Sequence, residues 1–212
     1  DKFSVGFTEV QEIGTVVYLA VDKVYTGHLL ISDAIKDDAI ESITEMKKLG
    51  IKNIIMLTGD SKKVGEAVAN KLGITEVYSE LLPQDKVAKF EEILSRKEKN
   101  EKVAFVGDGI NDTPVLARSD IGIAMGGLGS DAAIEAADVV LMDDRPSKIV
   151  TAMQVAKNTR RIVWQNIFFA LGVKGLFLVL GAFGIATMWE AVFADVGVTV
   201  IAVLNSMRIL NK

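Results

Sequence analysis

The chain has 212 residues, 50% of them hydrophobic, with a net charge of -4 and a mean hydropathy of +0.31. It contains no cysteine, which excludes a disulfide framework or a thiolate metal site within these residues. The sequence has no basic patch interleaved with aromatic residues, so we expect no nucleic-acid partner. Charge is unevenly distributed, because residues 162–204 hold only Lys174, Glu190 and Asp195 as charged side chains. The composition predicts a polar globular part followed by a membrane part.

The first predicted elements are two strands within residues 14–33, which are rich in β-branched and aromatic side chains and are expected to turn at Asp22-Lys23. Helical and strand patterns then alternate. Amphipathic helical spacing covers residues 36–50, 61–73 and 85–96, and short apolar runs typical of buried strands cover 52–57, 102–107 and 139–142. This alternation predicts an α/β fold with a parallel sheet and right-handed crossovers.

Polar side chains follow two of the apolar runs, where the strands are expected to end. One group consists of Asp108, Asn111 and Asp112, and the other is Thr58-Gly59-Asp60. Parallel sheets carry out their chemistry at the carboxyl ends of the strands, so both groups are expected at the same edge. Two carboxylates and an amide at a tight turn suit Mg2+, which prefers oxygen ligands.

Lys86, just after Pro83, is expected to bring an ammonium group to the same edge. A hydroxyl, an ammonium and Mg2+ together neutralise the oxygens of a phosphoryl group, which is most of what phosphoryl transfer requires. Each motif alone also has a structural explanation, since Asx side chains stabilise turns and Asp60 is a good helix N-cap. The order of the motifs at strand ends favours the catalytic interpretation.

The segments MLTGD, LLPQDKV, VGDGINDTPVLARSDIGIAMG and SDAAIEAADVVLM resemble the phosphorylation domain of P-type ATPases, members of the haloacid-dehalogenase superfamily. The similarity runs from about Thr15 to the end of the chain. The resemblance implies a haloacid-dehalogenase-like parallel sheet with flanking helices, followed by a two-helix transmembrane hairpin.

The same resemblance implies roles for the site residues. Asp108 would bind Mg2+, with Asp112 supporting that site. Thr58 and Lys86 would contact the phosphoryl group, and Asn111 would orient it. Asp60 belongs to the same T-G-D motif and would shape the site.

The nucleophile of the family is an aspartate in a D-K-T-G-T motif on a central strand of the same sheet, and ATP phosphorylates it. No such motif occurs in this sequence, which begins with Asp1 rather than Met. By the resemblance, residues 1–30 are the last strands of a nucleotide-binding domain, 31–157 the phosphorylation domain and 158–212 a transmembrane helix pair. We therefore expect this chain to be a portion of a longer pump and not to turn over ATP by itself. The remainder of the pump would supply the missing strand, and the residues that contact the nucleotide are unknown.

Two apolar stretches, 162–187 and 188–210, are each long enough to cross about 30 Å of hydrocarbon. Two arginines precede the first stretch and Arg208 closes the second, so the positive-inside rule places both ends in the cytoplasm. We expect a hairpin with a short external turn at 187–190. The sequence thus predicts a multi-pass protein of the plasma or inner membrane, in contact with lipid, whose soluble part is cytoplasmic.

Lys174 and Asp195 are the notable charges inside these stretches. Arg161 precedes Lys174, and Arg208 follows Asp195, by thirteen residues in each case, or about 20 Å of helix, so a hairpin puts the two charges at one depth. A charge at mid-bilayer costs about 2.5–3.5 kcal/mol on insertion scales and is usually functional. A purely structural ion pair is the alternative. In the functional interpretation, Asp195 binds a transported cation and Lys174 is its counter-ion when the site is empty.

The segments GVKG and ADVG, around these two charges, resemble the zinc/cadmium/lead class of heavy-metal exporting P-type ATPases. That class implies ATP-driven export of Zn2+, Cd2+ or Pb2+ through an aspartyl phosphate, with Mg2+ as cofactor and ATP as substrate. Its Cys-Pro-Cys segment would lie in the remainder of the pump. Three alternatives stay open: a P-type ATPase for another transition metal, a haloacid-dehalogenase phosphatase with a membrane anchor, and a non-enzymatic regulatory subunit.

Overall fold

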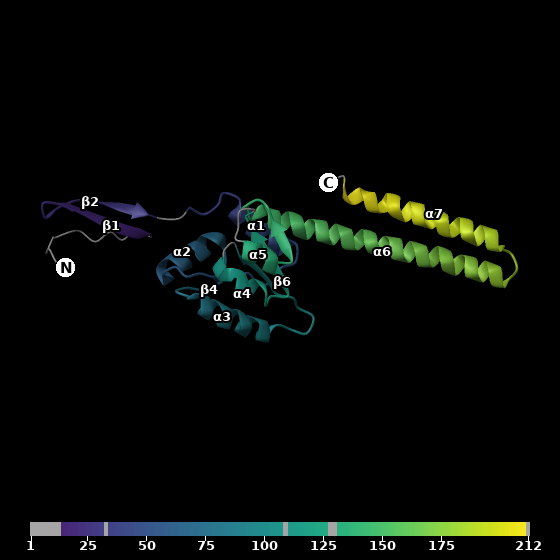
Figure 1. Ribbon diagram of the computed structural model, residues 1–212, viewed down its shortest axis with the longest axis horizontal. Coiled ribbons are helices and arrows are strands. Elements are labelled where there is room, and N and C mark those ends of the chain that lie inside the picture. Colours follow the sequence, from purple (N-terminus) through teal and green to yellow (C-terminus); the bar gives the residue numbers. More distant parts are fainter. Residues whose placement is uncertain (1–13, 32–33, 108–109, 127–130, 211–212) are drawn as a thin grey trace. The chain divides into compact units, whose positions relative to one another are not determined.

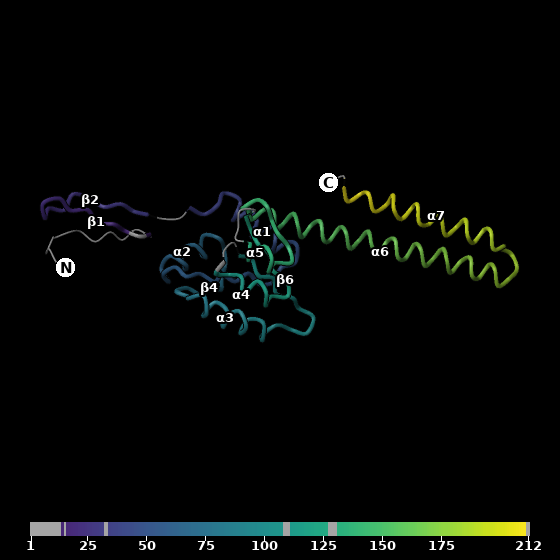
Figure 2. The backbone as a smooth tube through the Cα atoms, in the orientation of Figure 1, coloured from purple at the N-terminus to yellow at the C-terminus, as the bar shows by residue number. Residues whose placement is uncertain are grey.

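The computed structural model describes residues 14–31, 34–107, 110–126 and 131–210 (Figure 1). The chain divides into two compact units, Asp1–Ile149 and Val150–Lys212, and each is described by itself. Figure 2 follows the backbone through both. The domain boundaries predicted from the sequence stay predictions.

The first unit begins with an antiparallel hairpin of β1 (Thr15–Val21) and β2 (Val24–Ile31). The two residues between the strands, Asp22 and Lys23, have positive φ angles of 50° and 65°. Positive φ at both central positions matches the right-handed twist of the flanking strands, as two-residue hairpins require. The turn therefore lies where the sequence predicted it.

The rest of the unit alternates short parallel strands with helices. The strands are β3 (Ile55–Leu57), β4 (Glu76–Tyr78), β5 (Ala104–Gly107), β6 (Ile121–Met125) and β7 (Val139–Leu141). The helices are α1 (Ala39–Lys48), α2 (Lys62–Leu72), α3 (Pro83–Arg96), α4 (Thr113–Leu116) and α5 (Asp131–Ala136), with a 3-10 turn, η1, at Ile110–Asp112. Every strand pair in this series is parallel, as predicted.

Helix ends in this unit follow local sequence signals. Gly50 and Gly73, with φ angles of 109° and 67°, follow α1 and α2 in a conformation that a side chain would strain. Helix α3 begins at Pro83, whose fixed φ suits a first helical position. The Asp85 carboxylate accepts a hydrogen bond from the Leu82 backbone N–H at 3.1 Å, which satisfies a donor at the start of the helix.

Within the described residues, the parallel strands form two sheets, β3–β4 and β5–β6–β7, instead of the single sheet that we expected. Helix α3 contacts both groups of strands. Phe90 of α3 is 2% exposed and meets Phe105 of β5 edge-to-face at 5.4 Å, while Lys89 of the same helix lies 4.5 Å from the centre of the Tyr78 ring of β4. The core is completed by Val115 and Leu116 of α4, which are 0% and 1% exposed.

The second unit contains most of α6 (Ser147–Ala182) and all of α7 (Met188–Ser206), which ends in a 3-10 turn, η2 (Met207–Ile209). Both helices are long and apolar enough to cross a membrane. Figures 1 and 2 show them running antiparallel, side by side.

The turn of this hairpin differs from the prediction by a few residues. Gly184 has a φ of 71°, and α7 already begins at Met188. Thr187 and Glu190, expected in the external turn, instead cap α7: the Glu190 carboxylate accepts a hydrogen bond from the Thr187 N–H at 2.7 Å. A threonine followed three residues later by a glutamate is a capping box, and this local signal outweighs the apolar pattern.

Candidate functional site

The Thr58-Gly59-Asp60 motif forms a tight loop at the end of β3. The Thr58 hydroxyl donates a hydrogen bond to Asp60 Oδ2 at 2.7 Å, and the Asp60 backbone N–H donates back to Thr58 Oγ1 at 3.1 Å. Backbone bonds join this loop to the residues after β4, since Glu80 N–H donates to the Asp60 carbonyl at 2.8 Å and Leu81 N–H to the Thr58 carbonyl at 3.1 Å. The loop is therefore fixed by both strands, and Asp60 fixes the direction of the Thr58 hydroxyl.

Gly59 lies where a side chain would be tightly placed. A Cβ atom at this position would be 3.3 Å from the Leu81 carbonyl oxygen. That distance is shorter than most Cβ contacts, and a backbone atom cannot rotate away from it. The middle residue of the motif is thus a glycine because two strand-end loops approach each other there.

Asp112 and Lys86 form an ion pair at the end of β5. Lys86 Nζ lies 3.0 Å from Asp112 Oδ1, and the two side chains are 19% and 12% exposed. Lys86 comes from the first turn of α3, whereas Asp112 comes from η1. Gly107, the last residue of β5, makes room for Asp112, because a Cβ there would approach the Asp112 Cβ to 2.8 Å.

The remaining predicted residues of this edge are only partly described. Asn111 lies in η1 next to Asp112 and is exposed. Asp108, the predicted Mg2+ ligand, lies outside the described residues. Among the residues that are described, no hydrogen bond or ion pair joins the Thr58 loop to Lys86 or Asp112, and no three acidic or histidine side chains converge on a metal-sized site. The assignments to phosphoryl transfer and Mg2+ stay predictions.

Asp120 forms a charged cluster that the sequence did not reveal. Its carboxylate lies 2.6 Å from Lys97 Nζ and 3.1 Å from Lys102 Nζ, and it accepts a hydrogen bond from the Val103 N–H at 3.0 Å. These partners, with the Lys97 hydrogen bond the largest contribution, hold the pKa of Asp120 well below its usual range. The cluster fixes the chain just before β5 and thus the strand that leads to Asp112.

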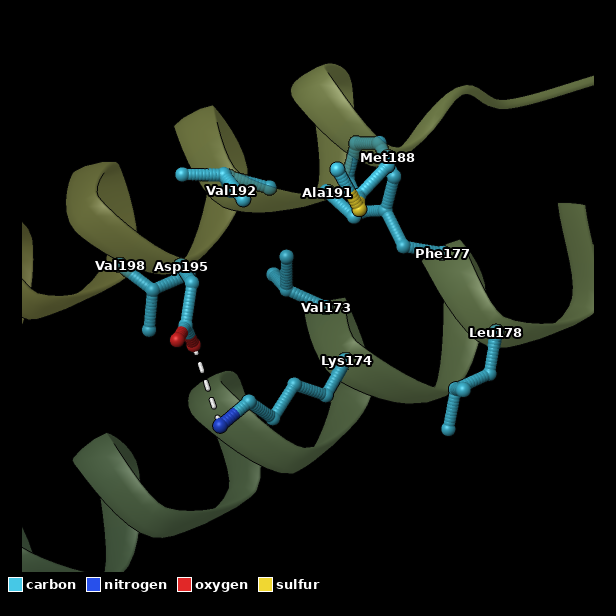
Figure 3. A pocket seen from close by; sticks show the side chains of 10 residues that line it. Val173, Lys174, Phe177, Leu178, Met188, Ala191, Val192, Asp195 and Val198 are labelled. Carbon is cyan, nitrogen blue, oxygen red and sulfur yellow. Dashed lines mark ion pairs between the residues drawn. The ribbon is translucent and has the colours of Figure 1, made fainter. Parts of the chain in front are cut away.

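The two charges of the hairpin meet. Lys174 Nζ lies 3.1 Å from Asp195 Oδ1, and Figure 3 shows the lysine of α6 extending toward the carboxylate of α7. They border a cavity of about 370 Å³. Its other lining residues are apolar: Val173, Phe177, Leu178, Met188, Ala191, Val192, Ala194 and Val198. Asp195 is the acidic group of this lining, so it is the group able to bind a cation there.

A second polar contact between α6 and α7 was missed. It consists of amide and hydroxyl side chains: Gln165, Asn166, Asn205 and Ser206. Neutral polar residues within an apolar stretch are a weaker signal of function than the charges of Lys174 and Asp195. The available signal was an adjacent pair of polar residues in each stretch, Gln165-Asn166 and Asn205-Ser206.

Similarity to known proteins identifies the family of this chain. Residues 2–120 match the family model of haloacid dehalogenase-like hydrolases, which is more than half of the chain. The chain belongs to the haloacid dehalogenase-like hydrolases. Within this family, its resemblance to the heavy-metal P-type ATPases is also confirmed by individual relatives.

A cadmium, zinc and cobalt-transporting ATPase of Bacillus subtilis is 66% identical over 201 residues, which cover 95% of this chain and 29% of that protein. A zinc-transporting ATPase of Synechocystis is 58% identical over 92% of this chain and 27% of its own length. The crystal structure of a zinc-transporting PIB-type ATPase in an E2.Pi state superposes with a TM-score of 0.82 at 38% identity, covering 92% of this chain and 31% of that one.

These matches confirm the predicted fold class, a haloacid-dehalogenase-like arrangement of parallel strands and helices followed by two membrane-length helices. The 38%-identical structure covers both units of the chain. The chain spans less than a third of the length of the curated relatives named above.

Proposed function

We propose that the chain is part of an ATP-driven pump that exports Zn2+, Cd2+ or Pb2+ through an aspartyl-phosphate intermediate. The observation that carries this proposal is the ion pair of Lys174 and Asp195 between two membrane-length helices. Charges in such a position are costly and usually functional. The names of the relatives, which transport cadmium, zinc and cobalt, support the same class of cargo.

In the membrane, Asp195 would bind the cation and Lys174 would replace it. An unpaired carboxylate in hydrocarbon is unfavourable, so the empty site needs a positive partner. Lys174 supplies that charge at 3.1 Å. A divalent cation competes with the ammonium for the carboxylate, and after the cation leaves, the lysine restores neutrality. The protonated amine has no lone pair, so Lys174 is a counter-ion rather than a ligand.

In the soluble unit, the strand-end residues would bind and orient a phosphoryl group. Asp112 and Asp108 would hold Mg2+, because carboxylate oxygens at the end of β5 are the donors that this ion prefers. Bound Mg2+ supplies positive charge next to the phosphoryl oxygens. Lys86 would add an ammonium at the same place, Thr58 would donate its hydroxyl in the direction set by Asp60, and Asn111 would orient the group.

The phosphorylated aspartate would come from the remainder of the pump. Within the described residues, β3 pairs with β4 and β5 pairs with β6, so each has an edge with unpaired backbone groups. Such edges are normally covered. We infer that the strand carrying the D-K-T-G-T motif pairs with these edges and brings its aspartate to the end of the sheet where Thr58 and Asp112 lie. Lipid and the other membrane helices of the pump would cover the exposed apolar faces of α6 and α7.

Orientation follows from the distribution of charge. Arg160 and Arg161 precede the first apolar stretch and Arg208 closes the second, so an antiparallel hairpin brings all three to the same end. The positive-inside rule places that end in the cytoplasm. The protein would then be a multi-pass protein of the plasma or inner membrane with its α/β unit in the cytoplasm, where ATP is available.

The ion class is tested on the full-length pump by ATPase activity with Zn2+, Cd2+, Pb2+, Co2+ and Cu+ in turn. We expect the first three to stimulate most, because the charged oxygen ligand of Asp195 suits a divalent cation better than the soft, monovalent Cu+. If Co2+ is the best activator, the transported ion is a divalent metal other than the three proposed. Cu+ as the best activator, or no stimulation by any metal, would contradict the proposal.

A further inference from the structure

Besides the ion pair, α6 and α7 are joined by a network of uncharged side chains. Asn166 of α6 donates hydrogen bonds to the Ala202 carbonyl at 3.2 Å and to Ser206 Oγ at 3.0 Å. Asn205 of α7 donates to Asn166 Oδ1 at 2.8 Å and to Gln165 Oε1 at 3.5 Å. We call these four side chains, Gln165, Asn166, Asn205 and Ser206, the amide network.

The side-chain amide groups of Asn166 and Asn205 all have hydrogen-bond partners. Both N–H donors of Asn166 and both of Asn205 have acceptors, and Asn166 Oδ1 accepts from Asn205. Asn205 Oδ1 in turn accepts a hydrogen bond from Arg208 at 3.0 Å. Because these amide groups are engaged with one another, they are not arranged as ligands for a passing cation. They are arranged to hold two helices together.

The position of the network relates it to the ion pair. Asn166 precedes Lys174 by eight residues, and Asn205 follows Asp195 by ten, which is about 12 and 15 Å of helix. The hairpin is therefore joined at two levels, by the network near the arginine end and by the ion pair farther along. Ser206 and Ala202 are eleven and seven residues after Asp195, and these spacings bring all three to nearly the same face of α7.

The two levels differ in how metal binding should affect them. A divalent cation competes for Asp195 and separates it from Lys174, whereas the amide network carries no charge to lose. A hydrogen bond between side-chain amides in an apolar environment also has a fixed direction, and breaking it leaves unsatisfied polar groups. The network can thus remain closed while the ion pair opens.

We propose that the amide network is a positioning element, which holds α6 and α7 in the register that brings Lys174 and Asp195 together. The inference rests on the proposed function, since it concerns the response of the pump to its metal. Asn166 and Asn205 would not touch the cation. Their effect would reach the metal through the separation of the ion pair.

The test uses the full-length pump with Asn166→Leu, Asn205→Leu and the double variant, since leucine is of similar size and cannot form hydrogen bonds. The Zn2+ concentration for half-maximal ATPase stimulation should fall by about threefold to twentyfold in each single variant, because Lys174 is then held less closely to Asp195 and competes less with the metal; this range is that of interhelical polar contacts in membranes. The double variant should shift this concentration no further than the more affected single variant, because each substitution already removes the Asn205–Asn166 hydrogen bond. Phosphorylation by inorganic phosphate, which needs no transported metal, should be unchanged.

Two controls separate positioning from general damage. Thr159→Val removes a hydroxyl whose bond, to the Val155 carbonyl, lies within α6, and it should leave the half-maximal Zn2+ concentration unchanged. In a Lys174→Ala background the ion pair is already absent, so Asn205→Leu should no longer shift that concentration.

The outcomes are distinct. If Zn2+ stimulates the wild-type pump and its half-maximal concentration is unchanged or raised in both asparagine variants, the positioning role is overturned and the proposed function is not. A parallel loss of phosphorylation by inorganic phosphate also overturns the positioning role alone. An equal shift in the Lys174→Ala background also overturns it, because the network would then act independently of the ion pair. A wild-type pump that no metal stimulates overturns the proposed function and this inference with it.

Discussion

At the scale of single residues, the two candidate sites share one chemical feature: a lysine already paired with the aspartate that the function needs. Lys86 lies 3.0 Å from Asp112, and Lys174 lies 3.1 Å from Asp195. In each case the ammonium lies within ion-pair distance of the carboxylate that a divalent cation would bind. The difference lies in the surroundings, because the first pair lies within the soluble unit and the second borders an apolar cavity.

Asp195→Ala tests the membrane residue. We expect it to abolish metal-stimulated phosphorylation of the full-length pump by ATP, because the cavity loses its acidic ligand, and to spare phosphorylation by inorganic phosphate. Both are measured as acid-stable radioactive phosphate on the protein. Full metal stimulation in this variant would reduce Asp195 to a structural role. Asp195→Asn, which keeps the size of the side chain, should behave like the alanine variant if charge is what the metal requires.

Gly107→Ala tests how tightly Asp112 is positioned. The added methyl group would meet the Asp112 Cβ at 2.8 Å and Phe105 at 3.0 Å, so these neighbours have to shift and the ion pair of Asp112 with Lys86 is disturbed. Overpacking of this kind costs about 1–3 kcal/mol of folding stability. We expect a lower unfolding temperature together with slower phosphorylation. Gly27→Ala is the matched control, because a Cβ there meets nothing within 4 Å, and a loss as large as that of Gly107→Ala would disprove the steric explanation.

At the scale of elements, local patterns predicted most of the helices and strands, and contacts distant in sequence remained invisible. Helices α1 and α2 follow their apolar periodicity and are each followed by a glycine, Gly50 and Gly73. The turn of the hairpin lies a few residues earlier than predicted, because Thr187 and Glu190 form the capping box of α7. The separation of β3–β4 from β5–β6–β7 had no counterpart in the sequence pattern, because strand pairing depends on contacts between distant residues.

Two further contacts show why pattern analysis could not complete the site. The N-terminus of α6 is capped by Asp38, whose carboxylate accepts a hydrogen bond from the Ser147 N–H at 2.9 Å, and these residues are 109 positions apart. Hydrogen bonds from Ser147 lower the pKa of Asp38. The amide network joins residues about 40 positions apart. Neither contact has a spacing that a single sequence reveals, since each depends on how elements pack.

The Asp120 cluster predicts how the stability of the soluble unit depends on pH. The pKa of Asp120 is lowered in the folded state, so its stabilising contribution is complete above the unfolded pKa of about 3.9 and is lost as the pH falls through the lower folded value. Asp120→Asn should therefore lower the unfolding temperature at pH 7. The difference from the wild type should shrink as the pH falls below about 4. A difference that stays constant over this range would show that Asp120 acts through its shape and not its charge.

At the scale of the whole molecule, one chain joins a charged α/β unit to a hairpin almost without charge. Residues 162–204 contain three charged side chains, although a quarter of the whole sequence is charged. Many apolar side chains of α6 and α7 are exposed in the hairpin, among them Leu178 and Phe193, which are 75% and 76% exposed. Exposed apolar surface on this scale requires lipid or other membrane helices to cover it. The composition of the α/β unit thus suits water, and that of the hairpin suits a membrane.

These 212 residues contain no cysteine, so when the segment is expressed by itself, a single introduced cysteine reports its orientation in the membrane. The chain is expressed with a single cysteine at Ile185, in the hairpin turn, or at Lys48, at the end of α1, and treated with a maleimide that does not cross membranes. Because the arginines are retained inside, the cysteine at Ile185 should react in intact cells and the one at Lys48 only after lysis. A cysteine at Leu178, within the apolar span, should react in neither case, since the reagent does not enter lipid. Labelling at Lys48 in intact cells, with protection at Ile185, would reverse the topology and place the phosphorylation residues on the side where ATP is absent.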